Sequence, residues 1–468
     1  MIRPLAASLL ALLAAAAAGC APSNSALRHP VDTDLARRLG DPELRIGDDA
    51  RAATTAIADR LGKPLDRAAA VRIALANNAR LRAALAEVGV AGAGLALALG
   101  PTEVHAQARF VGGTTDLELD LLQDLLGLLS AAPRRAAGRF EVAAAQAAAT
   151  AAALRLVARV EMAFHDLIAA QQELELRRTA FDAADAAAVV RERMHAAGNT
   201  PMLALARDRA AREQARVELA RAEAAIEVRR EALNALLGLT GEQTRWTAAG
   251  RLADLPAAPP SLDDLEPRAV AASVDLAGGR ARVDAAANRV TDQRLRSALP
   301  HLAAGIAVHR EHDDTGDGGL AIGPAISLGL PLLDWNSDGR ARAHAERRRA
   351  EHELAATAVE LRAAARAARI TALSSYQEAR HLRDVVLPLR QQIVDETLKH
   401  YNAMDADPFT LIAARRDLAD AGHQYLDALR RYWNATSQVA ALGRGVAVDA
   451  PADPPDAPRA PMRGPDAH

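Results

Sequence analysis

The sequence predicts a mostly helical protein with a small β part, built from one structural unit that occurs twice. Segments with helical periodicity fill most of the 468 residues, and four short segments alternate with a period of two. The second half repeats the order of the first: helix, two strands, a very long helix, a tight turn and a returning helix. The repeats end alike, in EALNALLG at 231–238 and SQVAALG at 437–443. A repeat of this length is too large for a solenoid unit, so we interpret it as an internal duplication.

The composition favours long helices in close contact over a thick globular core. Aromatic residues make up 3% of the chain and hydrophobic residues 50%, and much of that share is alanine. Alanine is the best helix former but buries little apolar area. The formal net charge of −2 gives no broad basic surface, so nucleic acid is excluded as an expected partner.

The N-terminal segment has the features of a bacterial lipoprotein signal peptide at 1–19. Arg3 precedes an apolar stretch at 5–18 that is too short to span a bilayer. The stretch ends in Ala17-Ala-Gly-Cys20, which resembles a lipobox, so we expect a covalent lipid on Cys20. The alternative is an ordinary secretion signal with a chance cysteine. Cys20 is the only cysteine, which excludes a disulfide within the chain. Since no later stretch of about 20 apolar residues is uninterrupted, no transmembrane helix is expected.

The first repeat is predicted at 65–238. A helix at 65–99 stops at Gly100-Pro101, and a helix of 64 residues at 134–197 is about 95 Å long. A turn at 198–201 leads into the returning helix at 202–237. Before this repeat, 20–64 is predicted as extended chain with short helices. After it, 239–261 is a connector rich in proline and glycine.

The second repeat is predicted at 262–443. Its helices are expected at 262–299, at 340–403 with a kink at Pro388, and at 409–442. In each repeat the two shorter helices together match the long one in length. Stacked end to end, they would make a wall of near-constant height. The tail at 444–468 is predicted to be disordered.

The alternating segments predict β-strands with one apolar face. They lie at 104–110, 117–121, 302–308 and 320–330, and strands of about ten residues suit a tilted transmembrane β-strand. Four strands cannot close a barrel, and open sheet edges are not tolerated in hydrocarbon. Three chains would supply twelve strands. The other face supplies the candidate pore-lining residues, which are His105, Arg109, Glu118, Asp120 and His309. The alternative is a soluble antiparallel sheet with one wet face.

Several matched features resemble the TolC-type outer membrane efflux channel family, in its lipoprotein branch. They are the duplicated order, the Leu-Leu-Gly238 ending, the turn His195-Ala-Ala-Gly198, and Leu330-Pro-Leu-Leu-Asp-Trp-Asn336 followed by Gly339-Arg340. The resemblance implies a homotrimer with a 12-stranded outer-membrane β-barrel on a long periplasmic α-helical barrel. It implies an equatorial collar formed by 20–64 and 239–261.

The same resemblance implies a function and partners. The chain would be lipid-anchored in the bacterial outer membrane, would contact outer membrane lipid, and would project into the periplasm. It would act as a passive exit channel, docked to a periplasmic adaptor (membrane fusion) protein and an inner-membrane efflux pump. Drugs, metals, solvents and peptides all remain open as substrates. The alternative is a periplasmic adaptor or lipid-anchored coiled-coil scaffold, which would need a compact lipoyl-like β-domain and a single hairpin.

The candidate gate departs from the pattern of this family. Such channels often have Asp in the returning helix just past the second periplasmic turn, where this chain has Thr410 and Ala413. The candidate gate residues are therefore Asp405 and Asp407 in the turn, Asp208 in the first repeat, and Arg415. In a trimer Asp405 and Asp407 would form rings of negative charge that favour cations. The alternative is turn chemistry, since Asp suits turns and helix starts. The junction at 121–129 also lacks the compact form of 330–336.

Motifs of catalysis and metal binding are missing from the sequence. It contains no Cys/His zinc pattern, no glycine-rich phosphate loop and no Gly-x-Ser-x-Gly elbow. The segment 313–318 mimics the start of a calcium loop, but its twelfth position is Pro324, which has no carboxylate. We therefore expect no enzyme, no metal site, and no cofactor apart from the lipid on Cys20.

Overall fold

We describe the fold from a computed structural model, which defines residues 23–41, 57, 60–99, 105–111, 114–124, 130–298, 301–310, 320–329 and 337–449. The chain forms two compact units. The first contains Met1–Ile46, Ala79–Ala153 and Ser273–Arg362, and the second contains Gly47–Asn78, Leu154–Ala272 and Ala363–His468. Each unit therefore takes segments from both repeats. The mostly helical fold with a small β part is confirmed.

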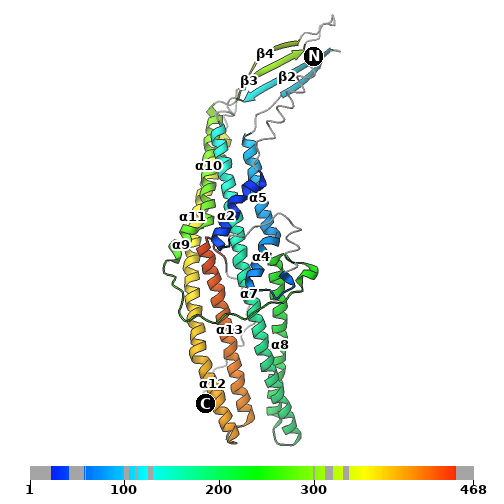
Figure 1. Cartoon of the computed structure of the whole chain (residues 1–468), viewed down its shortest axis with the longest axis vertical. Helices are drawn as coiled ribbons and strands as arrows, with labels where there is room; N and C mark the ends of the chain where they lie inside the picture. Colours follow the sequence, from blue (N-terminus) through cyan, green and yellow to red (C-terminus); the bar gives the residue numbers. More distant parts are fainter. Residues whose placement is uncertain are drawn as a thin grey trace. The chain divides into compact units, whose positions relative to one another are not determined.

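The first unit carries a four-stranded antiparallel sheet in the order β1-β2-β3-β4 (Figure 1). The strands are β1 (His105–Val111), β2 (Thr114–Asp124), β3 (His301–Arg310) and β4 (Leu320–Gly329). The central pair, β2 and β3, joins the first repeat to the second. Strands β1 and β4 are the two edges of the sheet within one chain.

The register of the sheet separates two faces. His105 pairs with Asp120, and Glu118 pairs with both Gln107 and His309, so these residues share one face. The same face continues through Gly323, Ala325 and Ser327 of β4. On the other face of β4, Ile322, Ile326 and Leu328 are 66%, 77% and 63% exposed. One chain therefore leaves this apolar face uncovered.

The helices of the first unit are α2 (Asn24–Leu39), α5 (Ala79–Leu99), α10 (Val274–Ala298), and the N-terminal parts of α7 (Ala131–Ala196) and α11 (Ser337–His381). Helix α2 corrects the expectation of extended chain with short helices, because it runs for 16 residues. The Ser23 hydroxyl caps its first turn, and Leu27, Val31 and Leu35 form a buried stripe at a spacing of four residues. Gly92 admits Leu27, since a Cβ there would lie 2.2 Å from the Leu27 Cδ1 atom.

The helices of the second unit follow the predicted pattern closely. They are α4 (Arg67–Asn77), the C-terminal part of α7, α8 (Met202–Leu237), the short η1 (Gly241–Thr244), α9 (Leu265–Ala272), the end of α11, α12 (Leu387–Asn402) and α13 (Pro408–Arg444). The distortion expected at Pro388 takes the form of a π-helical segment, η2 (Leu382–Val386), directly before it. Proline has no N–H to bond the carbonyl one turn earlier, which explains why the regular ladder breaks there.

The prediction of single helices at 65–99 and 262–299 was wrong, because each is interrupted once. The interruptions fall at Asn78 and Ser273, which occupy the same place in the two repeats. Asn78 has a ψ angle of 119°, and its side-chain amide donates to the Leu236 carbonyl over 2.9 Å. The Ser273 hydroxyl instead accepts from the Leu276 N–H over 3.2 Å and caps α10. Side-chain hydrogen bonds to the backbone therefore compete with the helix at both positions.

A buried carboxylate joins the two repeats inside the second unit. Asp166 of α7 accepts from Arg430 over 3.1 Å and from Asn434 over 2.8 Å, both on α13. Arg229 of α8 lies 3.6 Å from its second oxygen. Since Asp166 and Asn434 are buried, this network fixes α7 and α8 against α13.

Side chains from α11, η2 and α13 hold the backbone of the connector at 239–261 through hydrogen bonds. Trp433 donates to the carbonyl of Ala253 over 2.8 Å, and Arg383 donates to that of Leu255 over 3.1 Å. The Tyr376 hydroxyl lies 3.1 Å and 3.0 Å from the carbonyls of residues 256 and 257. Side chains therefore satisfy backbone groups that a helix or sheet would otherwise pair.

Helix α7 contains one stretch that is long and apolar enough to cross a membrane by composition. This stretch qualifies the expectation that no such helix follows the N-terminal segment. The described part of the chain buries 44% of that stretch, and its apolar character comes largely from alanine. A packed interior helix has the same composition, so the stretch alone does not indicate a membrane span.

His165 directly precedes Asp166 in α7 and supplies a test of the buried network around that carboxylate. His165 is 8% exposed, and burial, with the charge of Arg67, lowers its pKa to about 4. Between pH 6.5 and 4 the unfolded chain binds a proton that the folded chain does not, so stability falls as pH falls. From pH 7 to pH 5 this group should lower the free energy of unfolding by about 2 kcal/mol.

We expect His165→Gln to remove that part of the pH dependence in denaturant unfolding followed by circular dichroism. The exposed His352→Gln is the control and should keep the wild-type slope. Equal slopes for all three proteins would contradict the assignment.

Candidate functional site

The two hairpins of the second unit end in turns of the same conformation. In the first turn Gly198 has a φ angle of 77° and the Asn199 N–H donates to the Met194 carbonyl over 2.8 Å. In the second, Met404 has a φ angle of 62° and the Asp405 N–H donates to the His400 carbonyl over 2.9 Å. This left-handed position favours glycine. Met404 therefore holds a strained backbone while its side chain is 96% exposed.

Asp407 starts helix α13. Its carboxylate accepts from the N–H groups of Phe409 and Thr410 over 2.7 Å and 2.9 Å. This is the geometry of a helix N-cap, so turn chemistry accounts for Asp407. Asp405 is different, because its carboxylate lies 2.8 Å from the His400 Nδ1 atom and is 72% exposed. Both acids are exposed, and Asp405 is the one whose carboxylate does not cap a helix.

Asp208 belongs to a cluster that links three helices and the first turn. It accepts from Arg191 of α7 over 2.5 Å, and Arg191 also donates to the Thr200 hydroxyl over 3.2 Å. The Arg191 guanidinium lies 3.1 Å from the centre of the Phe409 ring on α13. A cation held over an aromatic face is attracted to it, so this contact joins the first hairpin to the second. We call Arg191, Asp208 and Phe409 the hairpin latch.

Sequence reasoning selected Asp208 but missed Arg191 and Phe409. Arg191 lies 17 residues before Asp208, across the turn, and a pairing of helix positions through the turn would have suggested that partner. Phe409 comes from the other repeat, and no local spacing indicates it.

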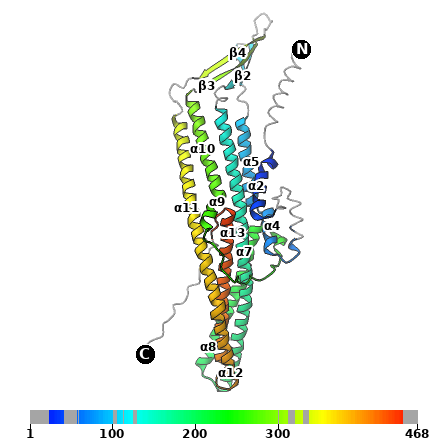
Figure 2. The same ribbon diagram turned by 60° about the vertical axis from the view of Figure 1, so that its left-hand side comes forward.

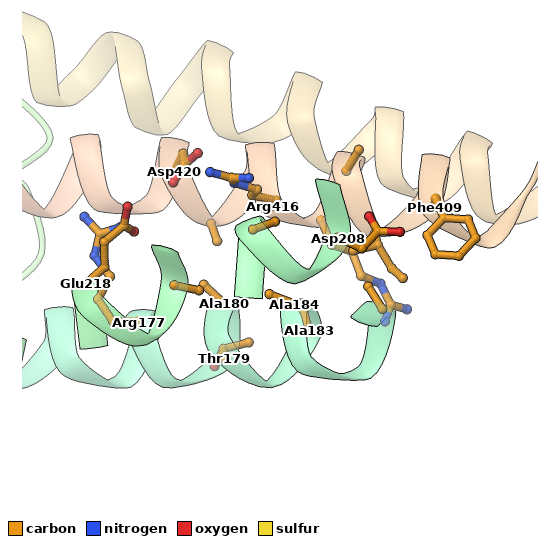
Figure 3. Close-up of a pocket in the computed structure, with 17 residues that line it drawn as sticks. Arg177, Thr179, Ala180, Ala183, Ala184, Asp208, Glu218, Phe409, Arg416 and Asp420 are labelled. Atoms are coloured by element: carbon orange, nitrogen blue, oxygen red, sulfur yellow. The ribbon is translucent and has the colours of Figure 1, made fainter. Parts of the chain in front are cut away.

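A cavity of about 420 Å³ adjoins the latch between the first hairpin and α13 (Figure 3). Alanines of α7, α8 and α13 supply nearly half of the residues in its wall, and Asp208 and Phe409 lie at one end of it. Arg415 and Arg416 also line it, and both are exposed, with no carboxylate within ion-pair distance among the described residues. Arg415 is therefore near the latch but is not part of it.

The remaining predicted residues are distributed as follows. His105, Arg109, Glu118, Asp120 and His309 lie in the strands of the first unit, whereas the candidate gate residues lie in the second. Cys20 and the calcium-like segment 313–318 lie outside the described residues. Within the residues that are described, no group of three or more His, Cys, Asp or Glu side chains is arranged to hold a metal ion.

Comparison with known proteins finds a relative in sequence and several solved structures with a similar fold. No protein-family model matches the chain. It is 27% identical over 387 residues to the cobalt-zinc-cadmium resistance protein CzcC of Cupriavidus metallidurans, which covers 81% of this chain and 90% of that protein.

Several solved structures have a similar fold. The outer membrane protein VceC of Vibrio cholerae has a TM-score of 0.66 at 18% identity and covers 81% of this chain and 96% of that one. The CmeC outer membrane channel of Campylobacter jejuni has a TM-score of 0.59 at 15% identity, covering 81% and 86%. The open-state MtrE outer membrane channel of Neisseria gonorrhoeae has a TM-score of 0.58 at 18% identity, covering 82% and 90%.

The strain at Met404 gives a direct test of the turn geometry. Since glycine adopts the left-handed region without penalty, Met404→Gly should raise the free energy of unfolding by about 1 kcal/mol. Gly198→Ala places a side chain at the matching position and should lower it by about the same amount. Thermal or denaturant unfolding of the full chain measures both. A destabilised Met404→Gly protein would contradict the interpretation of this residue as strained.

Proposed function

We propose that the chain belongs to the TolC-type outer membrane channel family and is the passive outer membrane exit channel of a tripartite efflux system; its similarity to CzcC and to the fold of VceC supports this. It conducts small molecules or ions that an inner-membrane pump and a periplasmic adaptor deliver. The pump supplies the energy. The alternative of an adaptor or scaffold needs a single hairpin, whereas the second unit has two, α7–α8 and α12–α13.

The uncovered apolar face of β4 is the observation that carries this proposal. Ile322, Ile326 and Leu328 are exposed on one face, and Gly323, Ala325 and Ser327 lie on the other. This is the pattern of a strand with lipid on one side and a polar lumen on the other. Three chains that pair β1 with β4 would close twelve strands and remove every edge.

The polar face of the sheet then lines the pore. His105, Arg109, Glu118, Asp120 and His309 all lie on this face by register. Charged and small residues there keep a water-filled path open for hydrophilic cargo.

The hairpin latch and the acid at the second turn form the gate at the periplasmic end. The latch holds the first hairpin to α13 and keeps the entrance narrow. Opening releases the Phe409 contact as the hairpins untwist near Gly198 and Met404. In the trimer, three Asp405 carboxylates favour cations at the entrance. Together with the metals in the name of the CzcC relative, this charge makes divalent cations the first cargo to test.

The barrel assignment is tested by placing charge on each face of β4. Arginine at the middle of a lipid-facing strand costs about 2–4 kcal/mol. We expect Ile326→Arg to prevent the heat-modifiable trimer that outer membrane fractions should contain, while Ser327→Arg on the polar face leaves it intact. A wild-type monomer in the inner membrane would overturn the proposed function.

The gate assignment is tested by single-channel conductance of the reconstituted protein. Arg191→Ala removes both the ion pair and the ring contact, so we expect a larger conductance. The control is Arg216→Ala on the surface of α8, because Arg216 ion-pairs with Glu213 of the same helix and lies over the Phe181 ring of α7, so its contacts stay within the first hairpin. Cation selectivity in the same recordings tests the ring of charge. Asp405→Asn should lower the preference for cations. Asp407→Asn keeps an oxygen for the helix cap and should leave that preference unchanged. Unchanged cation preference in Asp405→Asn would refute the ring of charge.

A further inference from the structure

Exposed arginines gather where the helices of the first unit adjoin the strands. Two residues separate α10 from β3, six separate β2 from α7, and seven separate β4 from α11. Near these helix ends, five exposed arginines have no ion-pair partner among the described residues, and they are Arg135, Arg139, Arg294, Arg340 and Arg348. We call this set the arginine belt.

Helix α2 marks the outer side of the helical wall. Its first residue, Asn24, follows Cys20 by four positions, and the lipid expected on Cys20 has to reach the membrane from outside the channel. Both views show α2 against α5 (Figures 1 and 2). Gln146 of α7 donates to the Leu27 carbonyl of α2 over 2.8 Å. The side of α7 that carries Gln146 is therefore the outer side.

On α7, two arginines of the belt share this outer side. Arg135 and Arg139 precede Gln146 by eleven and seven residues, which is close to three and two helical turns. Glu141, the only acid of α7 between residues 131 and 146, lies two residues beyond Arg139 and so about 200° round the helix. There it pairs with Arg289 of α10 over 2.7 Å. The outer side of this stretch thus carries arginine, and its acid faces inward.

The same reasoning places the other three arginines on the outer side. Arg289 of α10 faces inward, where it also lies 3.9 Å from Glu346 of α11. Arg294 is about 140° round α10 from Arg289. Arg340 and Arg348 are about 120° and 200° round α11 from Glu346. All three therefore project away from the inner side of the wall.

Contacts within the chain do not account for these charges. Helix α7 has no acidic residue in its first turn, and Arg135 is its fifth residue, close to the positive end of the helix dipole, which disfavours a cation. Arginines nearby that face the wall are paired, as Arg296 is with Asp292 over 3.2 Å. The belt is thus available for an anion that comes from outside the chain.

We propose that the arginine belt binds the anionic headgroups of phospholipids in the leaflet at which the strands end. This rests on the proposed barrel, whose apolar band sets the helix ends at the membrane surface. Arg135, Arg294 and Arg340 lie within five residues of a helix end, or about 7 Å, which is comparable with the headgroup layer. Guanidinium groups bind phosphate oxygens through two parallel hydrogen bonds. Arg139 and Arg348 lie farther from the helix ends and add attraction over about a Debye length.

Spin-labelled lipids test the belt on the full-length protein in phosphatidylcholine vesicles. Electron paramagnetic resonance compares how strongly labelled phosphatidylglycerol and labelled phosphatidylcholine associate with the protein. Wild type should prefer phosphatidylglycerol by about twofold or more over all boundary sites, since the roughly fivefold effect of one surface arginine is diluted by sites away from the belt. Salt at about 1 M should weaken this preference.

Two triple variants remove equal charge from different places. The belt variant, Arg135→Gln with Arg294→Gln and Arg340→Gln, should lose the preference for phosphatidylglycerol. The control, Arg193→Gln with Arg207→Gln and Arg221→Gln, should keep it. The control arginines are exposed in the second unit and have no ion-pair partner in the part of the chain that the structure describes.

The outcomes separate this inference from the proposed function. A heat-modifiable wild-type trimer without a lipid preference, or an unchanged preference in the belt variant, would overturn the belt alone. A belt variant that keeps the lipid preference but alters ion selectivity in single-channel recordings would place these arginines in the pore and overturn it too. A wild-type monomer in the inner membrane would overturn the proposed function with it.

Discussion

The buried carboxylate of Asp166 is the interaction on which the arrangement of the second unit depends. A charge in a dry interior is tolerated only when it is paired and fully hydrogen-bonded. Arg430 and Asn434 satisfy that requirement from α13, and Arg229 adds positive charge from α8. The requirement fixes the rotation of three helices about their axes. That rotation brings Arg191 over Phe409.

The hydrophobic periodicity of the sequence was sufficient to predict most helices and strands, because it indicates directly which face of each is buried. Helix α8 agrees with its prediction at both ends, and the strands agree within a few residues. The breaks at Asn78 and Ser273 were missed, since hydrophobic period continues through them and only side-chain bonding to the backbone ends the helix. The length of helix α2 was missed for the opposite reason: the helix contains Pro30, which disfavours a helix interior, yet three buried residues on one face stabilise it.

The hairpin latch was the least predictable part of the second unit. Asp208 stood out as an acid near a turn, but its role depends on Arg191 and on Phe409, whose positions follow from tertiary packing. The internal duplication would also suggest that the two turns are equivalent, which they are not. The two turns share a backbone conformation, yet glycine at 198 and methionine at 404 give them different strain and different surfaces. Similarity of fold between the repeats thus does not carry over to similarity of role.

The uncovered face and open edges of the sheet have a consequence at the level of the cell. A single chain has no state in which its four strands are satisfied, in water or in lipid, so in a trimer insertion has to follow association. In the proposed trimer, every barrel would contain strands from three separately synthesised chains. One defective subunit would then disable two sound ones, and a cell that expresses a mixture of alleles would lose most of these assemblies. Variation in these strands is therefore expected to be dominant in its effect, and purifying selection on them correspondingly strong.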